Sequence, residues 1–210
     1  MWGVTGMARS VSRSLYWLGA GAAVVLLLYS LLPTTQDSPY MKLHSTGEGS
    51  VFTGCEFSSI QHDVPAFRFA MSPQACRLVR YDGSSGIEFT LEYPTAEVVS
   101  DDAKGSRYPI ALFIQRISME GFDADRHLRG KHPVALADGV EGYEVGGFQE
   151  RKFTGKDGVS VYVSDYVATV RANRLYGSGL WVFYQYPKEL TDVRAVDDFV
   201  LGALGNVLAG

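Results

Sequence analysis

The segment IEFTLEY at residues 87–93 decides the fold class of this 210-residue chain. Its odd-numbered residues are Ile, Phe, Leu and Tyr, and its even-numbered residues are Glu and Thr. Successive side chains of a strand point to opposite faces of a sheet, so this alternation predicts a half-buried strand with one face in water. Pro94 follows directly and ends the strand, because proline has no N–H for the next ladder hydrogen bond.

Three segments further along the chain also favour strands. IALFIQRI (residues 110–117) is apolar on both faces for five residues, which indicates a more deeply buried strand. VSVYVSDYVATVR (159–171) alternates at first and loses its phase near Asp165, which predicts a bulge or bend there. LWVFYQY (180–186) is apolar on both sides, which is typical of a central strand. The dipeptide Asp-Gly at 157–158 predicts a hairpin turn.

Residues 191–208 predict one amphipathic helix near the C-terminus. We place Thr191 as its N-cap. Five aliphatic residues form one stripe at helical spacing: Val193, Val196, Val200, Leu204 and Val207. Gly202 and Gly205 lower helix propensity, and a close contact with a sheet would explain both. Residues 122–128 predict a second helix, short and polar. These elements together predict an α+β domain, with a mostly antiparallel sheet and a C-terminal packing helix.

The run LYWLGAGAAVVLLLYSLL at residues 15–32 is uncharged and almost wholly apolar, and it predicts one N-terminal transmembrane helix. A helix of this length spans about 27 Å, enough to cross most of a bilayer core. Arg9 and Arg13 precede the run, so the positive-inside rule predicts a cytoplasmic N-terminus. The predicted organisation is a cytoplasmic N-terminus at 1–14, a transmembrane anchor at 15–32, a flexible tether at 33–50 and an exported α+β domain at 51–210.

Alternatives to this topology and location stay open. A cleaved signal peptide needs a shorter apolar region and a pair of small residues before the cut, and residues 29–33 (YSLLP) hold no such pair. We expect a bacterial inner membrane with the domain in the periplasm. A mitochondrial inner membrane, with the domain in the intermembrane space, is the alternative. It is kept because residues 1–19 carry Arg, Ser and Thr but no acid, as a presequence does.

Cys55 and Cys76 are the only cysteines, and both lie in the predicted exported part. An even pair outside the cytoplasm predicts a disulfide, which would agree with the topology. A redox or metal pair is the alternative, although the spacing is not C-x-x-C. Without Arg9 and Arg13, 17 basic residues remain against 23 acidic ones, net −6, and this acidic balance argues against nucleic acid as a partner.

The order of these elements resembles the PsbP-like sandwich. Over residues 85–208 the resemblance is carried by a strand that ends in Tyr93-Pro94, a later hairpin, an aromatic-rich strand and a terminal amphipathic helix. It implies a small lumenal or periplasmic domain that acts as an accessory factor rather than as an enzyme. The segment with the two cysteines has no counterpart in this pattern.

Motifs for catalysis, cofactors and metals are weak. GSSG (83–86) and GSG (177–179) do not match a nucleophile elbow, and no phosphate-binding or dinucleotide-binding glycine loop occurs. His127 and His132 lie near two aspartates, but three cations share the stretch, and a spacing of five does not place both imidazoles on one helical face. The acid pair at 197–198 falls on the polar side of the last helix. We therefore expect no catalytic residue, no metal site and no cofactor.

The aromatic strand at 180–186 supplies the candidate interface. Only one convincing helix follows the anchor, so one apolar face of this strand needs loops or a partner to cover it. Trp181, Phe183, Tyr184 and Tyr186 are of the residue types enriched at interfaces, and core packing is their alternative fate.

The sequence as a whole favours a single-pass membrane-anchored protein that presents a periplasmic protein-binding domain, as an envelope accessory subunit or an immunity-type protein. It would not be an enzyme, and the identity of its protein partner stays open. The alternative is a small-molecule-binding or hydrolytic periplasmic domain whose site is assembled from scattered residues.

Overall fold

The computed structural model describes residues 38–45, 52–61, 64–101 and 105–208. The predicted anchor at 15–32 lies outside the described residues. Within the described ranges, none of the helices has the length and apolar character that a bilayer crossing needs. Part of the predicted tether is a strand instead, because residues 41–44 pair with a neighbouring strand of the domain.

A small three-stranded sheet comes first. Its strands are β1 (Met41–His44), β2 (Gly54–Phe57) and β3 (Phe67–Phe69), paired antiparallel in that order. The short helix α2 (Pro73–Cys76) follows, and the Ser72 hydroxyl caps it by accepting from the backbone N–H of Ala75. Cys55 on β2 and Cys76 on α2 form a disulfide with a Cα–Cα separation of 6.1 Å, which confirms the predicted pairing.

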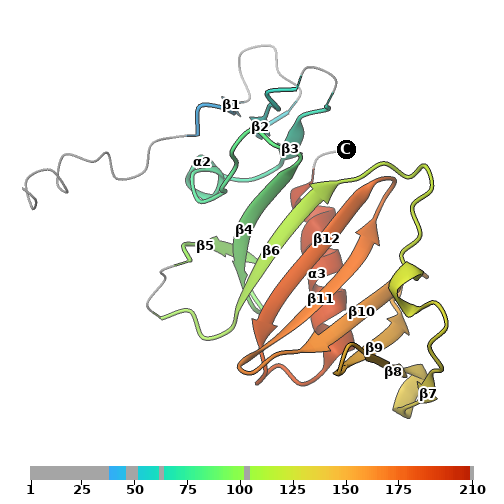
Figure 1. Ribbon diagram of the computed structural model, residues 1–210. Coiled ribbons are helices and arrows are strands. Elements are labelled where there is room, and N and C mark those ends of the chain that lie inside the picture. Colours follow the sequence, from blue (N-terminus) through green and yellow to red (C-terminus); the bar gives the residue numbers. More distant parts are fainter. Residues whose placement is uncertain (1–37, 46–51, 62–63, 102–104, 209–210) are drawn as a thin grey trace, which may run out of the picture. The chain divides into compact units, whose positions relative to one another are not determined.

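The larger sheet has nine strands, and every neighbouring pair is antiparallel. Its order is β5-β4-β6-β12-β11-β10-β9-β8-β7, with β12 near the middle (Figure 1). The strands are β4 (Gly86–Glu92), β5 (Glu97–Val99), β6 (Pro109–Arg116), β7 (Val134–Ala135), β8 (Glu141–Val145), β9 (Phe148–Thr154), β10 (Ser160–Asp165), β11 (Thr169–Tyr176) and β12 (Leu180–Pro187). Two 3-10 turns, η1 (Arg126–Leu128) and η2 (Ala137–Gly139), lie between β6 and β8.

One helix, α3 (Val193–Val207), packs on one face of this sheet (Figure 1). Asp192, rather than Thr191, is its N-cap, and its carboxylate accepts from the backbone N–H groups of Arg194 and Ala195. A close contact with the sheet does not explain Gly202, where a side chain would meet nothing within 4 Å because the residue lies on the solvent side of the helix. At Gly205, which is also exposed, a Cβ would lie 3.9 Å from the hydroxyl of Tyr176 on β11, an ordinary contact distance.

Two differences from the sequence analysis concern local elements. Residues 159–171 are not one bent strand but the hairpin β10–β11, whose turn at 166–168 is Tyr-Val-Ala and carries no turn-forming residue. The predicted polar helix at 122–128 is reduced to the three residues of η1. The hairpin at 157–158 is confirmed between β9 and β10, and Gly158 adopts the positive φ of +81° that the turn needs.

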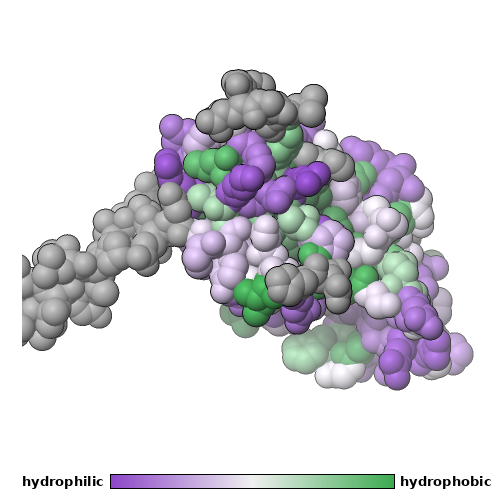
Figure 2. Space-filling model, turned by 90° about the horizontal axis from the view of Figure 1, so that it is seen from above, coloured by the Kyte–Doolittle hydropathy of each residue, from purple (hydrophilic) through white to green (hydrophobic). Residues whose placement is uncertain are grey.

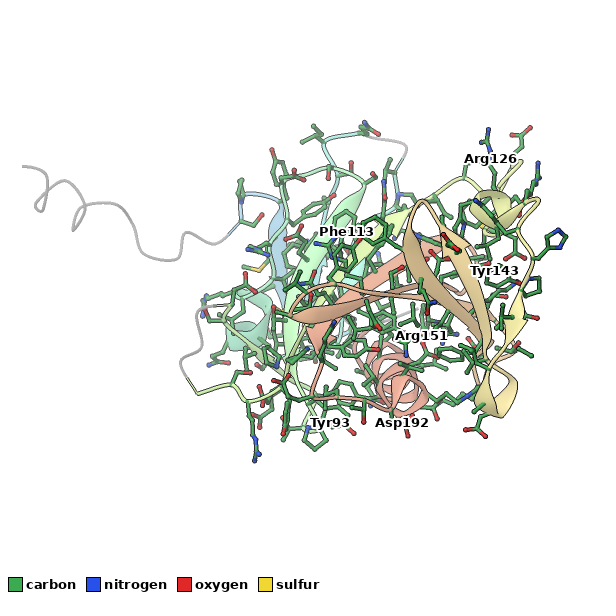
Figure 3. The ribbon with its side chains drawn as sticks, turned by 60° about the horizontal axis from the view of Figure 1, so that its bottom comes forward. Tyr93, Phe113, Arg126, Tyr143, Arg151 and Asp192 are labelled. Atoms are coloured by element: carbon green, nitrogen blue, oxygen red, sulfur yellow. A yellow bond between two sulfur atoms is a disulfide. The ribbon has the colours of Figure 1, made fainter. Side chains whose placement is uncertain are left out.

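The α+β architecture with a C-terminal helix is as predicted, and strand alternation divides the sheet into two faces. Toward α3 point buried residues of β4, β6 and β12, such as Phe89, Leu112 and Tyr184. Away from α3 points a second set that includes Phe113 and Phe183, and Figure 3 shows Phe113 on the side of the sheet opposite α3. We call this second side the open face.

Candidate functional site

The open face is partly covered by the connection that follows β6. Phe122 of this connection packs on Trp181 of β12, with ring centroids 5.1 Å apart. Leu128 in η1 is buried, and so is Tyr162 of β10. The cover reaches β10 and the Trp181 end of β12, and among the described residues no helix lies over the rest. The uncovered part is therefore the candidate site.

A shallow depression of about 410 Å³ lies in this uncovered part. Its walls come from β4, β6, β10, β11 and β12, and include Phe113, Phe183, Asn173, Gln185, Arg171 and Tyr166. By contrast, the end of the molecule that carries the small sheet has apolar residues scattered among hydrophilic ones (Figure 2). The depression thus combines the exposed ring of Phe183 and the half-buried ring of Phe113 with amide and guanidinium groups on the sheet.

The aromatic side of the depression is held by the sheet itself. Phe113 and Phe183 are cross-strand partners on β6 and β12, with ring centroids 5.9 Å apart. Phe113 also lies over Gly86 of β4, where an added Cβ would stand 2.5 Å from its ring. Phe183 remains 39% exposed, which is high for a phenylalanine in the middle of a sheet. Gly86 leaves room for the ring of Phe113, and Phe113 in turn packs beside Phe183. The exposed side of Phe183 therefore presents an apolar surface to solvent.

The charged side of the depression carries two arginines, one paired with carboxylates and one without a carboxylate partner among the described residues. Arg80 is neutralised by two carboxylates, with nitrogen–oxygen distances of 2.6 Å to both Glu88 and Asp101. Arg171 donates from Nε to the side-chain oxygen of Gln185 at 2.8 Å and lies 4.2 Å from the ring centroid of Tyr166. In the part of the chain that the structure describes, Arg171 makes no ion pair. The depression therefore offers one unmatched positive charge beside two aromatic rings.

A polar cluster ties the covering connection to the sheet. Asp125 lies 2.7 Å from the ammonium of Lys152 and accepts from the hydroxyl of Tyr162 at 2.7 Å. Burial alone would raise the pKa of Asp125, but the hydrogen bonds from Lys152 and Tyr162 outweigh it and lower that pKa. Burial, and then the bond to Asp125, raise the pKa of Tyr162. The cluster holds the connection in place, and its groups are already paired with one another.

The two histidines of the sequence analysis do not converge on a metal site. His127 lies 2.5 Å from Glu150 through Nε2, and His132 lies in an exposed segment. Among residues 38–45, 52–61, 64–101 and 105–208, no group of three or more His, Cys, Asp or Glu is arranged to hold a metal ion.

The predicted position of Asp197 on the polar side of the helix is wrong. Asp197 lies on the side of α3 that faces the sheet, where its side chain is fully buried beside the fully buried Arg174 of β11. Arg174 donates to Asp197 at 2.5 Å and also to Asp157, and the hydroxyl of Tyr184 donates to Asp197 at 2.8 Å. Burial opposes the charge of Arg174, but the two carboxylates outweigh it and raise its pKa. This cluster fastens the helix to the sheet, and it lies on the face opposite the depression.

The predicted interface residues separate into two pairs. Trp181 and Phe183 lie on the open face, with ring centroids 6.0 Å apart. The prediction that Tyr184 and Tyr186 belong to an interface is corrected, because both side chains point toward α3 and are only 2% and 1% exposed. Strand alternation is the reason, since neighbouring side chains cannot share one face. Tyr184 and Tyr186 are therefore core residues, and no partner can contact their side chains in this fold.

Phe113, Arg171 and Asn173 line the depression but were not predicted as site residues. Their strand pairing with β12 could not be known without the order of strands in the sheet. Strand alternation could have found these three residues only if the strand register had been known, because in that register they lie on the same face of the sheet as Phe183. Comparisons with protein-family models, with curated proteins and with solved structures find no match to this chain.

Proposed function

We propose that the chain is a membrane-anchored, periplasmic protein-binding module that docks its partner on the open face of the nine-stranded sheet. The observation that carries the proposal is the exposed ring of Phe183, beside the half-buried ring of Phe113, in a shallow depression that no helix among the described residues covers. Exposed aromatic rings on a rigid sheet lose little side-chain entropy when they are covered, which suits them to act as anchors for binding.

The unmatched charge defines the chemistry of the partner. Arg171 stands at the rim of the depression without a carboxylate among the described residues. A partner segment with an apolar side chain for the aromatic rings and a neighbouring Asp or Glu for Arg171 would complement both features. The guanidinium is held by Gln185 and Tyr166, so it is oriented before the partner arrives.

The location belongs to the same proposal. The Cys55–Cys76 disulfide is stable where the surroundings are oxidising, as in the periplasm or the mitochondrial intermembrane space. The apolar run at 15–32 would anchor the domain, with Arg9 and Arg13 on the cytoplasmic side. An accessory subunit or an immunity-type protein needs these properties: a domain kept at the membrane and a surface that captures another chain.

A small-molecule site is the second candidate, because the depression lies within the size range of ligand pockets, about 300–1,000 Å³. Asn173, Gln185 and Arg171 could orient a polar ligand there. Most ligand pockets bury about 70–90% of their ligand. The 39% exposure of Phe183 therefore favours a protein surface as the occupant.

The test is photo-crosslinking of the full-length chain in its own membrane. One variant carries a photoreactive phenylalanine at Phe183, and a matched variant carries it at Ile60, which is exposed but lies outside the large sheet. We expect one protein adduct of defined mass at position 183 and none at position 60. The adduct should be lost when Arg171→Glu is added, because the new carboxylate repels the acid of the partner.

Two results would count against the proposal. A protein adduct at position 60 that persists when position 183 gives none places the interface elsewhere. An adduct below about 1 kDa at position 183, seen by intact mass, assigns the depression to a small molecule instead.

A further inference from the structure

A second cavity, of about 700 Å³, lies on the side of the sheet that carries α3. It opens where the small sheet meets the end of that helix, a junction held by the backbone hydrogen bond from Ala70 to Val207 at 2.7 Å. Its walls are mostly apolar: Pro65, Ala66, Phe67, Tyr176, Leu180 and Leu208. The open face and its depression lie on the other side of the sheet, so the two sites are independent.

Arg116, the last residue of β6, projects into this cavity. Its Nη2 donates to the carbonyl of Ala66 at 2.9 Å, and its guanidinium carbon lies 4.6 Å from the ring centroid of Phe67. Nε is buried and has no hydrogen-bond partner. Among the described residues Arg116 makes no ion pair, whereas Arg68 on the same wall is paired with Glu56 at 2.9 Å.

Arg116 is half-buried, so part of its guanidinium has lost its contact with water without gaining a carboxylate among the described residues. Removing a guanidinium from water without a counter-charge costs free energy, and buried charges are therefore normally paired. Consistent with that cost, burial lowers the pKa of Arg116. Arg174, which is fully buried on the same face, has two carboxylates. Arg116 is half-buried and has no carboxylate among the described residues, so a ligand in the cavity can supply its counter-charge.

We propose that this cavity binds an amphipathic anion, whose oxyanion group pairs with Arg116 and whose hydrocarbon chain lies on the apolar walls. The ring of Phe67 lies against the guanidinium and Ala66 holds Nη2, while Nε is buried, so Nη1 is the donor that is free to meet an oxyanion from the cavity. Tyr176 and Ser178 also line the cavity, and their hydroxyls make no hydrogen bond within the described ranges. The walls favour an acyl chain over a small inorganic ion.

The test measures binding of three probes to the full-length chain, held in amphipol so that no detergent competes. The probes are dodecanoate, dodecanol and inorganic phosphate. Dodecanoate and dodecanol share the chain and differ in charge, and phosphate has the charge without the chain. We expect dodecanoate to bind at least about tenfold more tightly than dodecanol, and more tightly than phosphate, because only dodecanoate satisfies both Arg116 and the walls.

Two variants locate the effect. Arg116→Met should reduce the affinity for dodecanoate about tenfold, to that of dodecanol, and leave dodecanol unchanged. The matched control Arg68→Met removes a cation from the same wall that is already paired, and should change dodecanoate affinity by less than about threefold. In the unaltered chain, the Nε–H resonance of Arg116 should shift when dodecanoate is added, which requires no variant to fold.

Each contrary result overturns the proposal. Equal affinity for dodecanoate and dodecanol removes the role of the charge. Phosphate that binds as tightly as dodecanoate removes the role of the chain. An unshifted Arg116 resonance at saturating dodecanoate, or full dodecanoate affinity in a folded Arg116→Met chain, places the ligand elsewhere.

Discussion

Arg174 of β11 donates from Nη1 to Oδ2 of Asp197 on α3 at 2.5 Å, and neither side chain reaches solvent. The pair joins the helix to the middle of the sheet, and Tyr184 completes it by donating to the second oxygen of Asp197. Helix attachment therefore depends on a charge pair in an otherwise apolar layer. That layer stands between α3 and the strands whose opposite sides form the open face.

Removal of the charge of Asp197 should destabilise the domain strongly. Asp197→Asn leaves Arg174 with Asp157 as its single carboxylate, and a broken buried pair costs about 3–5 kcal/mol. The neighbouring substitution Asp198→Asn is the control, because that carboxylate is half exposed and 3.8 Å from Lys156. Its cost should stay below about 1 kcal/mol in chemical denaturation. Equal costs for the two substitutions would contradict this role.

The disulfide should contribute about 3 kcal/mol to the free energy of unfolding, since it closes a loop between residues 21 positions apart. A reducing agent should lower the melting temperature of the unaltered chain. The same agent should have no effect on the double variant Cys55→Ala, Cys76→Ala, which should already melt at the lower temperature. A melting temperature that does not respond to reduction in the unaltered chain would exclude a stabilising disulfide.

The pKa of Asp125 should be lower than its usual value of 3.8, because Lys152 and Tyr162 hold it charged against the effect of burial. A carboxyl whose pKa is lower in the folded state stabilises the fold above its unfolded pKa, and this contribution is lost as pH falls through the folded value. Carboxyl chemical shifts followed from pH 6 down to pH 2 measure this. Lys152→Met should move the midpoint upward, and an unchanged midpoint would show that the ion pair does not form.

Gly86 should be coupled to Phe113. A Cβ at position 86 would stand 2.5 Å from the Phe113 ring, so Gly86→Ala should force the ring aside and cost about 1–3 kcal/mol. In a Phe113→Ala background the same substitution meets no ring and should cost close to nothing. The difference between the two costs is their coupling energy, measured by denaturation in a double-mutant cycle. Equal costs in both backgrounds would mean that the two residues do not pack on each other.

Strand alternation and helical periodicity in the sequence predicted most of the main elements of the fold. The segments at 87–93, 110–117 and 180–186 became β4, β6 and β12 within one residue at each end, and the stripe of 191–208 became α3. The hairpin β10–β11 was missed because its turn residues are Tyr166, Val167 and Ala168. These residues have no turn preference of their own, and strand pairing on both sides imposes the turn.

The candidate site was only half predictable for a related reason. A strand that is apolar on both faces does not indicate which face a helix covers, so Tyr184 could not be distinguished from Phe183. Asp197 lies beside Asp198 and looks equally polar in sequence, yet its burial depends on Arg174, which is 23 positions away. Partners that come from distant strands set both the charge pair and the depression, and local patterns do not report them.

The measurement that tests the central claim most directly is the mass of the full-length chain purified gently from its own cells. Three forms are compared: the unaltered chain, Phe183→Ser and Ile60→Ser, which each remove one exposed apolar side chain. We expect the unaltered chain and Ile60→Ser to carry a stoichiometric protein partner, and Phe183→Ser, equally stable, to carry none. A partner retained by Phe183→Ser, or a chain that is alone in all three forms, would contradict the central claim.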